Sequence, residues 1–142
     1  MQDARLKMQN ATSEKLKTKM QNDKSKFKKE FRGRVYRFAL DVIEFIEQLP
    51  KGQVSNIIGD QLLRSATSIG ANVIEAQGAS SRKDYTNFFA HALKSANETE
   101  FWLCLLRDSG KAERERTENL LREVIELSKI LATSIMTLKG KG

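Results

Sequence analysis

The sequence predicts an all-α protein, an antiparallel up-down-up-down four-helix bundle with a basic N-terminal extension. Three observations predict this class. Apolar residues recur at steps of three and four in four long segments, which is the spacing of amphipathic helices. The connections between these segments are short, as in antiparallel bundles. The 142 residues include only one Pro and eight Gly, and no segment alternates apolar and polar residues as a half-buried strand does.

The first bundle helix is predicted to begin at Phe27 and to end before Pro50. Its apolar positions share one face: Phe31, Val35, Phe38, Val42, Phe45/Ile46 and Leu49. Residues 1–26 contain few large apolar side chains, and a helix without a packing partner is marginal in water. We therefore predict two parts, a basic extension over residues 1–26 and the bundle over residues 27–142.

The second helix is predicted over residues 54–77, with Ser55 as its N-cap. Its apolar stripe consists of Leu62, Ala66, Ile69, Val73 and Ala76. Gly70 lies in the interior of this helix, where Gly costs about 1 kcal/mol relative to Ala. A close approach by a neighbouring helix would explain a glycine at that position.

The third and fourth helices are predicted over residues 82–108 and 112–138. Ser81 and Asp84 resemble a capping pair at the start of the third helix. The core stripe of this helix contains Tyr85, Phe89, Ala92, Ala96, Thr99, Leu103 and Leu106, and that of the fourth contains Leu120, Val124, Leu127, Leu131, Ile135 and Leu138. Phe101, Trp102 and Leu105 lie outside the third helix's stripe. They predict a second packing partner, and we assign them to an oligomer interface.

Polar residues lie beside the apolar stripes of the second and third helices at helical spacing. These are Ser68, Asn72 and Glu75 on the second helix, and Ser95 and Glu98 on the third. Since the two helices are antiparallel neighbours, we predict that these groups form hydrogen bonds that fix helix register. Arg64 or Arg82 would supply the countercharge that a buried Glu needs. A ligand site is the alternative.

The sequence predicts no catalytic residue, no metal site and no cofactor. His91 is the only histidine, and it shares one face of one helix with Ser95 and Glu98, whereas triad members converge from separate elements. A single histidine supplies too few ligands for a zinc or di-iron site. Cys104 is the only cysteine, and we predict that it is a buried apolar residue in a protein of the reducing cytoplasm. No transmembrane segment or signal peptide is predicted.

The positive charge of the chain is concentrated near its N-terminus. Residues 1–34 contain eleven Lys/Arg and four Asp/Glu, whereas the rest of the chain contains fourteen of each, for a net charge of +7. Such a segment attracts polyanions through counterion release. Solubilisation is the alternative. The candidate nucleic-acid-binding residues are Lys24, Lys26, Lys28, Lys29, Arg32, Arg34, Arg37, Arg82 and Lys83.

Residues 61–85 carry a family resemblance. Gln61-Leu-Leu-Arg-Ser-Ala-Thr-Ser-Ile-Gly-Ala-Asn72, followed by Glu75, Gly78, Ser81 and Lys83-Asp84-Tyr85, resembles the signature of the 23S rRNA intervening-sequence proteins, also called four-helix bundle proteins. Phe88-Phe89, Ala92, Ser95 and Glu98-Thr99-Glu100 extend the resemblance, which covers roughly residues 31–138. The Ala-Glu-Gly usual after that Asn is replaced by Ile74-Glu75-Ala76-Gln77-Gly78.

The resemblance implies a bacterial cytoplasmic bundle that forms a homopentameric ring and has no catalytic residues. The family is similar to the accessory variability determinants of diversity-generating retroelements, basic pentamers that partner a reverse transcriptase and its template RNA. We therefore expect a non-enzymatic homo-oligomer that binds nucleic acid, RNA rather than DNA, with reverse-transcriptase accessory work as one specific form. The alternative is a structural or protein-docking scaffold that binds no nucleic acid.

Overall fold

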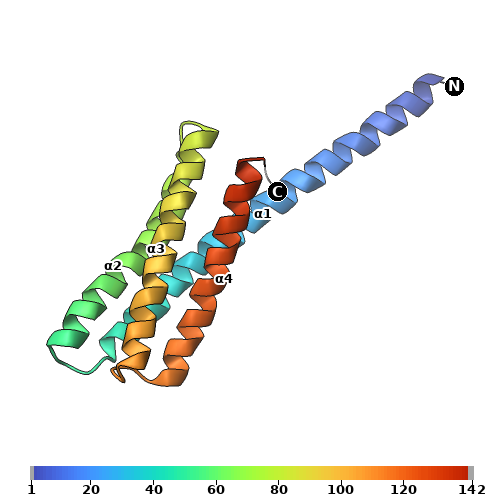
Figure 1. Cartoon of the computed structure of the whole chain (residues 1–142). Helices are drawn as coiled ribbons and strands as arrows, with labels where there is room; N and C mark the ends of the chain where they lie inside the picture. The colour runs from blue at the N-terminus through green and yellow to red at the C-terminus, as the bar shows by residue number, and fades with distance from the viewer. Residues whose placement is uncertain (1, 141–142) are drawn as a thin grey trace. The chain divides into compact units, whose positions relative to one another are not determined.

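The computed structural model describes residues 2–140, so the first residue of the predicted extension and the last two of the predicted bundle lie outside it. Four helices follow one another (Figure 1): α1 (Gln2–Glu47), α2 (Gln53–Ala76), α3 (Arg82–Asp108) and α4 (Arg114–Leu138). The chain divides after Gly33 into two compact units. We call residues 2–33 the arm and residues 34–140 the bundle. The predicted boundary after residue 26 falls within α1.

The bundle confirms the predicted fold class. α3 packs against both α2 and α4, and these three helices lie side by side (Figure 1). The bundle part of α1 packs against α2, since a Cβ added at Gly59 would lie 3.5 Å from Ile46 and one added at Gly70 would lie 3.9 Å from Val35. The described residues contain no strand. The arrangement is an up-down bundle.

The core of the bundle is formed by the predicted apolar stripes. Each helix contributes large side chains that are fully buried, among them Phe38, Leu62, Leu103 and Leu127. Ile135 and Leu138 of α4 are only half-buried, so the core becomes thinner towards the end of that helix. Every buried side-chain N or O atom of the described residues has a hydrogen-bond partner.

The ends of α3 lie where the sequence predicts them. At its start, the Ser81 hydroxyl accepts a hydrogen bond from the Asp84 N–H at 3.0 Å, and the Asp84 carboxylate accepts one from the Ser80 N–H at 3.1 Å. At its end, Gly110 has a φ of 72°, a left-handed conformation that glycine adopts without a steric penalty. These local signals explain why both ends of α3 were predicted correctly.

Two predictions about helix starts are wrong. Ser55 does not cap α2, because the helix begins at Gln53 and Ser55 is buried in its first turn. α1 begins at Gln2 rather than at Phe27. Residues 2–32 contain neither Gly nor Pro. They include eight Lys, three Gln, two Met and two Ala, which are strong helix formers even where no apolar stripe exists. Residues 3–30 are all exposed.

None of the described helices combines the length and the apolar character that crossing a bilayer requires.

Candidate nucleic-acid interface

The lysines of the arm form two rows on its helix. Lys17, Lys24 and Lys28 are separated by seven and four residues, so they share one side of the helix. A second row, formed by Lys15, Lys19 and Lys26, follows the other side at steps of four and seven. Residues 1–33 contain ten Lys/Arg and four Asp/Glu, and every lysine among them is exposed. Both rows can therefore contact phosphates.

The other arm candidates differ in their surroundings. Lys29 is exposed and Arg32 is half-buried. Lys26 lies 3.9 Å from Glu30, an exposed pair four residues apart on the helix, and such pairs hold the lysine only weakly. The Phe27 and Phe31 rings are nearly parallel, with centroids 6.4 Å apart.

Arg34 is committed to a contact within the bundle. Its Nε and Nη2 atoms donate to the two carboxylate oxygens of Glu123 at 2.9 and 2.8 Å, which joins α1 to α4. The hydrogen bond to Glu123 raises the pKa of the Arg34 guanidinium, although desolvation opposes the shift. A bidentate pair of this kind keeps its arginine in a fixed geometry. Arg34 is therefore a poorer candidate for phosphate binding than its neighbour Arg32.

Arg82 also has a partner in the bundle. Its Nε donates to the Leu138 carbonyl at 2.9 Å, and its Nη2 lies 3.4 Å from the Thr137 carbonyl. These carbonyls belong to the last turn of α4, where helix carbonyls have no partner within the helix. The guanidinium therefore caps α4. Arg37 and Lys83 are exposed on the bundle, and neither belongs to the two lysine rows of the arm.

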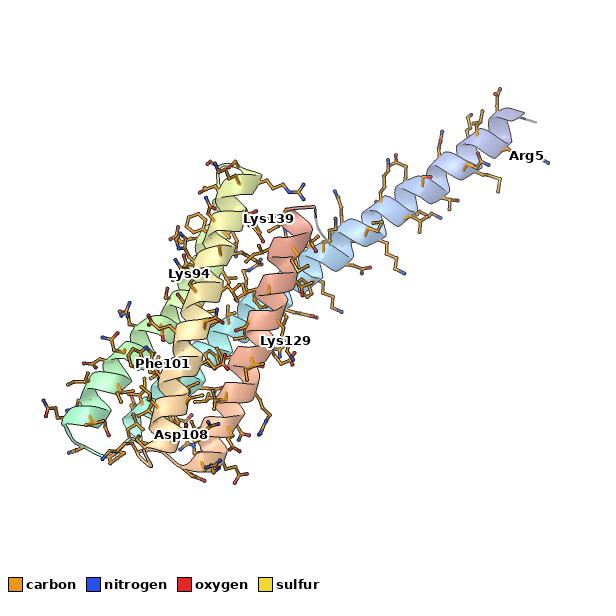
Figure 2. The ribbon with its side chains drawn as sticks, in the orientation of Figure 1. Arg5, Lys94, Phe101, Asp108, Lys129 and Lys139 are labelled. Atoms are coloured by element: carbon orange, nitrogen blue, oxygen red, sulfur yellow. The ribbon has the colours of Figure 1, made fainter. Side chains whose placement is uncertain are left out.

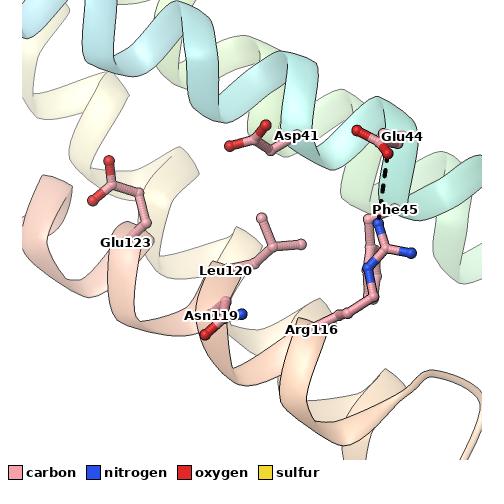
Figure 3. A pocket seen from close by; sticks show the side chains of 7 residues that line it. All are labelled: Asp41, Glu44, Phe45, Arg116, Asn119, Leu120 and Glu123. Carbon is pink, nitrogen blue, oxygen red and sulfur yellow. Dashed lines mark ion pairs between the residues drawn. The ribbon is translucent and has the colours of Figure 1, made fainter.

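A cleft of about 200 Å³ lies between α1 and α4 (Figure 3). Its carboxylates come from Asp41 and Glu44 on α1 and from Glu123 on α4. Arg116 lies 3.9 Å from Glu44 across the cleft. Because Glu123 is held by Arg34, two of the three carboxylates are paired with arginine. The cleft is thus lined by ion pairs that link the two helices, and its acidic lining does not suit a nucleic acid.

Hydroxyl groups connect α2 and α3 along the predicted polar seam. The Ser95 hydroxyl lies 2.8 Å from that of Ser68, and the Thr99 hydroxyl lies 2.8 Å from that of Ser65. Asn72 donates to the Ser68 carbonyl at 2.9 Å within α2. The structure therefore brings Ser68, Asn72 and Ser95 together. Ser65 and Thr99 complete the seam and are the most deeply buried of its members.

The two glutamates of the predicted polar core lie at its edge or outside it. Glu75 is exposed, so the prediction that it is buried in the seam is wrong. On α2 it lies seven residues after Ser68 and only about 20° from it around the helix axis, so helical spacing alone does not distinguish the two positions. Glu98 is half-buried and accepts hydrogen bonds from Arg64 at 3.2 Å and from the Trp102 ring N–H at 3.3 Å. Arg64, rather than Arg82, supplies the countercharge.

Exposed apolar side chains occur on α2 and α3 outside the bundle core. They include the predicted interface residues Phe101, Trp102 and Leu105 on α3, and Val54 and Ile57 on α2, and we call this set the α2–α3 face. Trp102 is half-buried, and the other four side chains are 37–56% exposed. Phe101 projects from α3 (Figure 2). Its ring meets that of Trp102 edge to face, with centroids 5.0 Å apart.

Sequence reasoning missed a second apolar surface, beside the α1–α2 contact. We call it the α1–α2 face, and it consists of Tyr36, Leu40, Ile43, Leu63 and Ile74, which are 37–68% exposed. Leu63 and Ile74 lie seven residues before and four after Gly70, whose Cα faces Val35 of α1. The spacing of Tyr36, Leu40 and Ile43, at i, i+4 and i+7, is the signal that could have identified it.

The residues considered for chemistry do not converge. His91 is exposed on α3, and Cys104 is half-buried rather than buried as predicted. Among residues 2–140, no three His, Cys, Asp or Glu side chains are grouped so that they could hold a metal ion. The geometry of the described chain thus offers charged and apolar surfaces for binding, and we assign no catalytic role to any residue.

Comparison with known proteins finds a matching family model and similar solved structures. The family model described as 23S rRNA-intervening sequence protein matches residues 28–133. A crystal structure of a protein of unknown function from the S23 ribosomal protein family of Bacteroides thetaiotaomicron is similar, with a TM-score of 0.70 and 38% sequence identity. The similarity covers 74% of this chain and 97% of that one. A search among curated proteins finds no match.

Proposed function

The chain belongs to the 23S rRNA-intervening sequence protein family, and from this premise we propose that it is a non-catalytic, homo-oligomeric protein that binds RNA through its arm. The partition of charge is the observation that carries the proposal. Residues 1–33 have a surplus of six positive charges, whereas residues 34–142 have a surplus of one. Both lysine rows are exposed along a helix of 32 described residues, which spans on the order of 50 Å.

The physical basis of binding is electrostatic. Each phosphate that a lysine neutralises releases condensed counterions, and this contribution needs no reading of base sequence. The family match begins at residue 28, so most of the arm lies outside it and the binding role rests on the charges of this chain. RNA is preferred to DNA because of the resemblance to accessory proteins of reverse transcriptases.

Oligomerisation is the second part of the proposal. The α1–α2 face and the α2–α3 face consist of different residues, and each contains at least four large apolar side chains that are more than a third exposed. Two different faces suit a head-to-tail contact. In such a contact the α1–α2 face of one copy packs against the α2–α3 face of the next, and the copies close into a ring. This supports the homopentamer that the resemblance implies. A pentamer would present five arms to one RNA, and multivalency would strengthen weak contacts.

The specific form of the proposal is an accessory subunit of a reverse transcriptase in a diversity-generating retroelement, acting in the bacterial cytoplasm. A reverse-transcriptase gene beside the gene for this chain would support it. The second candidate is a protein-docking scaffold, which the exposed apolar faces favour. In that case the faces bind other proteins and the arm has no role with nucleic acid.

The test is a fluorescence-anisotropy titration of the full chain with a structured RNA and a duplex DNA at two salt concentrations. One variant replaces Lys24, Lys26, Lys28 and Lys29 by Gln. The matched control replaces Lys51, Lys94, Lys111 and Lys139, four exposed lysines of the bundle, so that both variants have the same net charge. We expect the arm variant alone to lose affinity, with a salt slope smaller by about 0.7 for each phosphate contact to single-stranded RNA removed.

Light scattering on the same samples gives the oligomeric state. We expect a single species with the mass of five chains, and a lower mass after Phe101→Ser or Ile43→Ser, which change one residue of each face. Absence of binding to either nucleic acid at low salt would contradict the RNA proposal and leave the scaffold. An equal loss in the arm and bundle variants would show that net charge alone, and not the arm, governs binding.

A further inference from the structure

The arm carries an apolar seam that nucleic-acid binding does not explain. Leu6, Leu16, Met20 and Phe27 are 52–60% exposed, although all four are large and apolar. Positions 6, 9, 13, 16, 20, 23, 27 and 30 follow alternating steps of three and four, which is the a/d spacing of a coiled coil. Leu6, Met20 and Phe27 occupy a positions and Leu16 occupies a d position. Half of the seam is therefore apolar and exposed.

The positions that flank this seam are basic. In the same heptad frame, the g positions before the a residues hold Arg5, Lys19 and Lys26, and the e positions hold Lys17 and Lys24. The remaining flanking positions between residues 5 and 31 are the uncharged Asn10, Thr12 and Phe31. Asp3 occupies the e position before Leu6, Glu14 lies elsewhere on the helix, and Asp23 and Glu30 lie within the seam. Between residues 5 and 31, therefore, no acidic residue flanks the seam.

This distribution of charge disfavours a second copy of the arm as the partner. In a parallel pair, a g residue of one helix faces the e residue five positions later in the other. Lys19 would then face Lys24 of the second copy, and the other flanking cations would find no acid to pair with. Like charges at such positions destabilise helix pairing. A seam that is apolar at only four of eight positions offers little to offset that repulsion.

We propose that the arm is a docking helix for an amphipathic, acidic helix of another protein. Such a helix would cover the seam with its own apolar stripe, while Glu or Asp beside that stripe would pair with Lys17, Lys19 and Lys24. An acidic helix complements the charge of the arm, which a second copy of the arm does not. An amphipathic helix would also bury Leu16 and Met20, which a polyanion would leave exposed. The proposal does not depend on RNA binding, but RNA and the acidic helix would compete for the same lysines.

The test uses the full chain and a labelled four-heptad peptide with Leu at a and d and Glu at e and g. A second peptide with Lys at e and g is the charge-reversed control. The variants are Met20→Ala, which shortens a seam residue, and Met8→Ala, which makes the same change at an exposed position off the seam. Alanine keeps the helix propensity high in both variants. Binding is measured by anisotropy at physiological salt.

We expect the acidic peptide to bind and the basic peptide not to bind. Met20→Ala should weaken binding by about tenfold because apolar burial is lost, whereas Met8→Ala should change it less than about twofold. If the arm binds RNA as proposed above, excess RNA should displace the peptide. Circular dichroism of both variants checks that the arm remains helical.

Three outcomes would overturn the proposal. In the first, the acidic peptide does not bind. In the second, it binds equally well to the wild type, Met20→Ala and Met8→Ala, which would show that the arm acts only as a polycation. In the third, Met20→Ala lowers the mass of the assembly in light scattering, which would make a second copy the occupant of the seam. The RNA affinity of Met20→Ala, measured separately, shows whether RNA binding by the arm stands or fails independently.

Discussion

The arm and the bundle are both helical, but different physical effects make them so. In the bundle, the helices bury continuous apolar stripes, and side chains such as Val42 and Leu127 are completely buried. In the arm, every residue from 3 to 30 is exposed, and the helix rests on propensity alone. The packed core of the bundle therefore accounts for most of the stability of this protein. The arm contributes most of the surplus positive charge, and residues 3–30 are exposed on its surface.

The largest expected contrast comes from the same substitution made in each region. Leu103→Ala removes a fully buried side chain of α3 and should lower the free energy of unfolding by about 2–5 kcal/mol, since it leaves a cavity. Leu16→Ala in the arm should change it by less than about 0.5 kcal/mol. Urea denaturation followed by circular dichroism measures both. A loss above about 1 kcal/mol for Leu16→Ala would show that the arm is packed in solution.

The polar seam offers a second, smaller contrast. Thr99→Val removes a buried hydroxyl that lies 2.8 Å from the Ser65 hydroxyl, with little change in shape. We expect a loss of about 1 kcal/mol in unfolding free energy. The control, Thr67→Val, removes an exposed hydroxyl that bonds only within α2, and it should have almost no effect. Equal effects of the two substitutions would mean that the seam does not hold α2 and α3 in register.

Arg32 and Arg34 define the boundary between the two regions. Arg34→Gln breaks the bidentate pair with Glu123, which should cost about 1 kcal/mol of stability and leave RNA affinity almost unchanged. Arg32→Gln should leave stability unchanged and lower the salt slope of RNA binding by about 0.7. Unfolding and binding measurements on both variants separate these roles. The boundary would be misplaced if Arg34→Gln weakened RNA binding as much as Arg32→Gln.

Substitution of Gly70 should have the smallest effect on stability, and it should stabilise the protein rather than destabilise it. The structure leaves room for a Cβ there, 3.9 Å from the nearest side-chain atom of Val35, so the predicted close approach is not needed within the described chain. Gly70→Ala should therefore stabilise the protein by about 0.5–1 kcal/mol, as measured by the thermal midpoint. Destabilisation instead would indicate that another copy approaches α2 at this glycine, which lies between Leu63 and Ile74 of the α1–α2 face.

The features predicted correctly from the sequence are those that neighbouring residues determine, namely the bundle helices and a helix cap. The apolar stripes identified the four bundle helices, and the Ser81–Asp84 cap placed the start of α3 correctly. The arm helix was missed because the prediction relied on apolar periodicity, whereas the absence of Gly and Pro before Gly33 was the useful signal. Ser68 and Ser95 meet as predicted. The exposure of Glu75 was not predicted, because it depends on how α2 is rotated about its axis.

Long-range contacts account for the remaining differences. Arg82 caps α4 through carbonyls more than 50 residues away in sequence. Arg34 of α1 pairs with Glu123, which also belongs to α4. Nothing in the local sequence separates these arginines from Arg32 or Arg37. The packing of the bundle decides which of these arginines are used internally.

The most direct test of the two-region account is amide hydrogen exchange of the full chain, free and with a structured RNA. In the free protein we expect fast exchange over residues 2–30 and slow exchange in the bundle core. With RNA, exchange should slow in the arm, and α2 and α4 should not change. Protection that RNA induces in the bundle but not in the arm would contradict the assignment of binding to the arm.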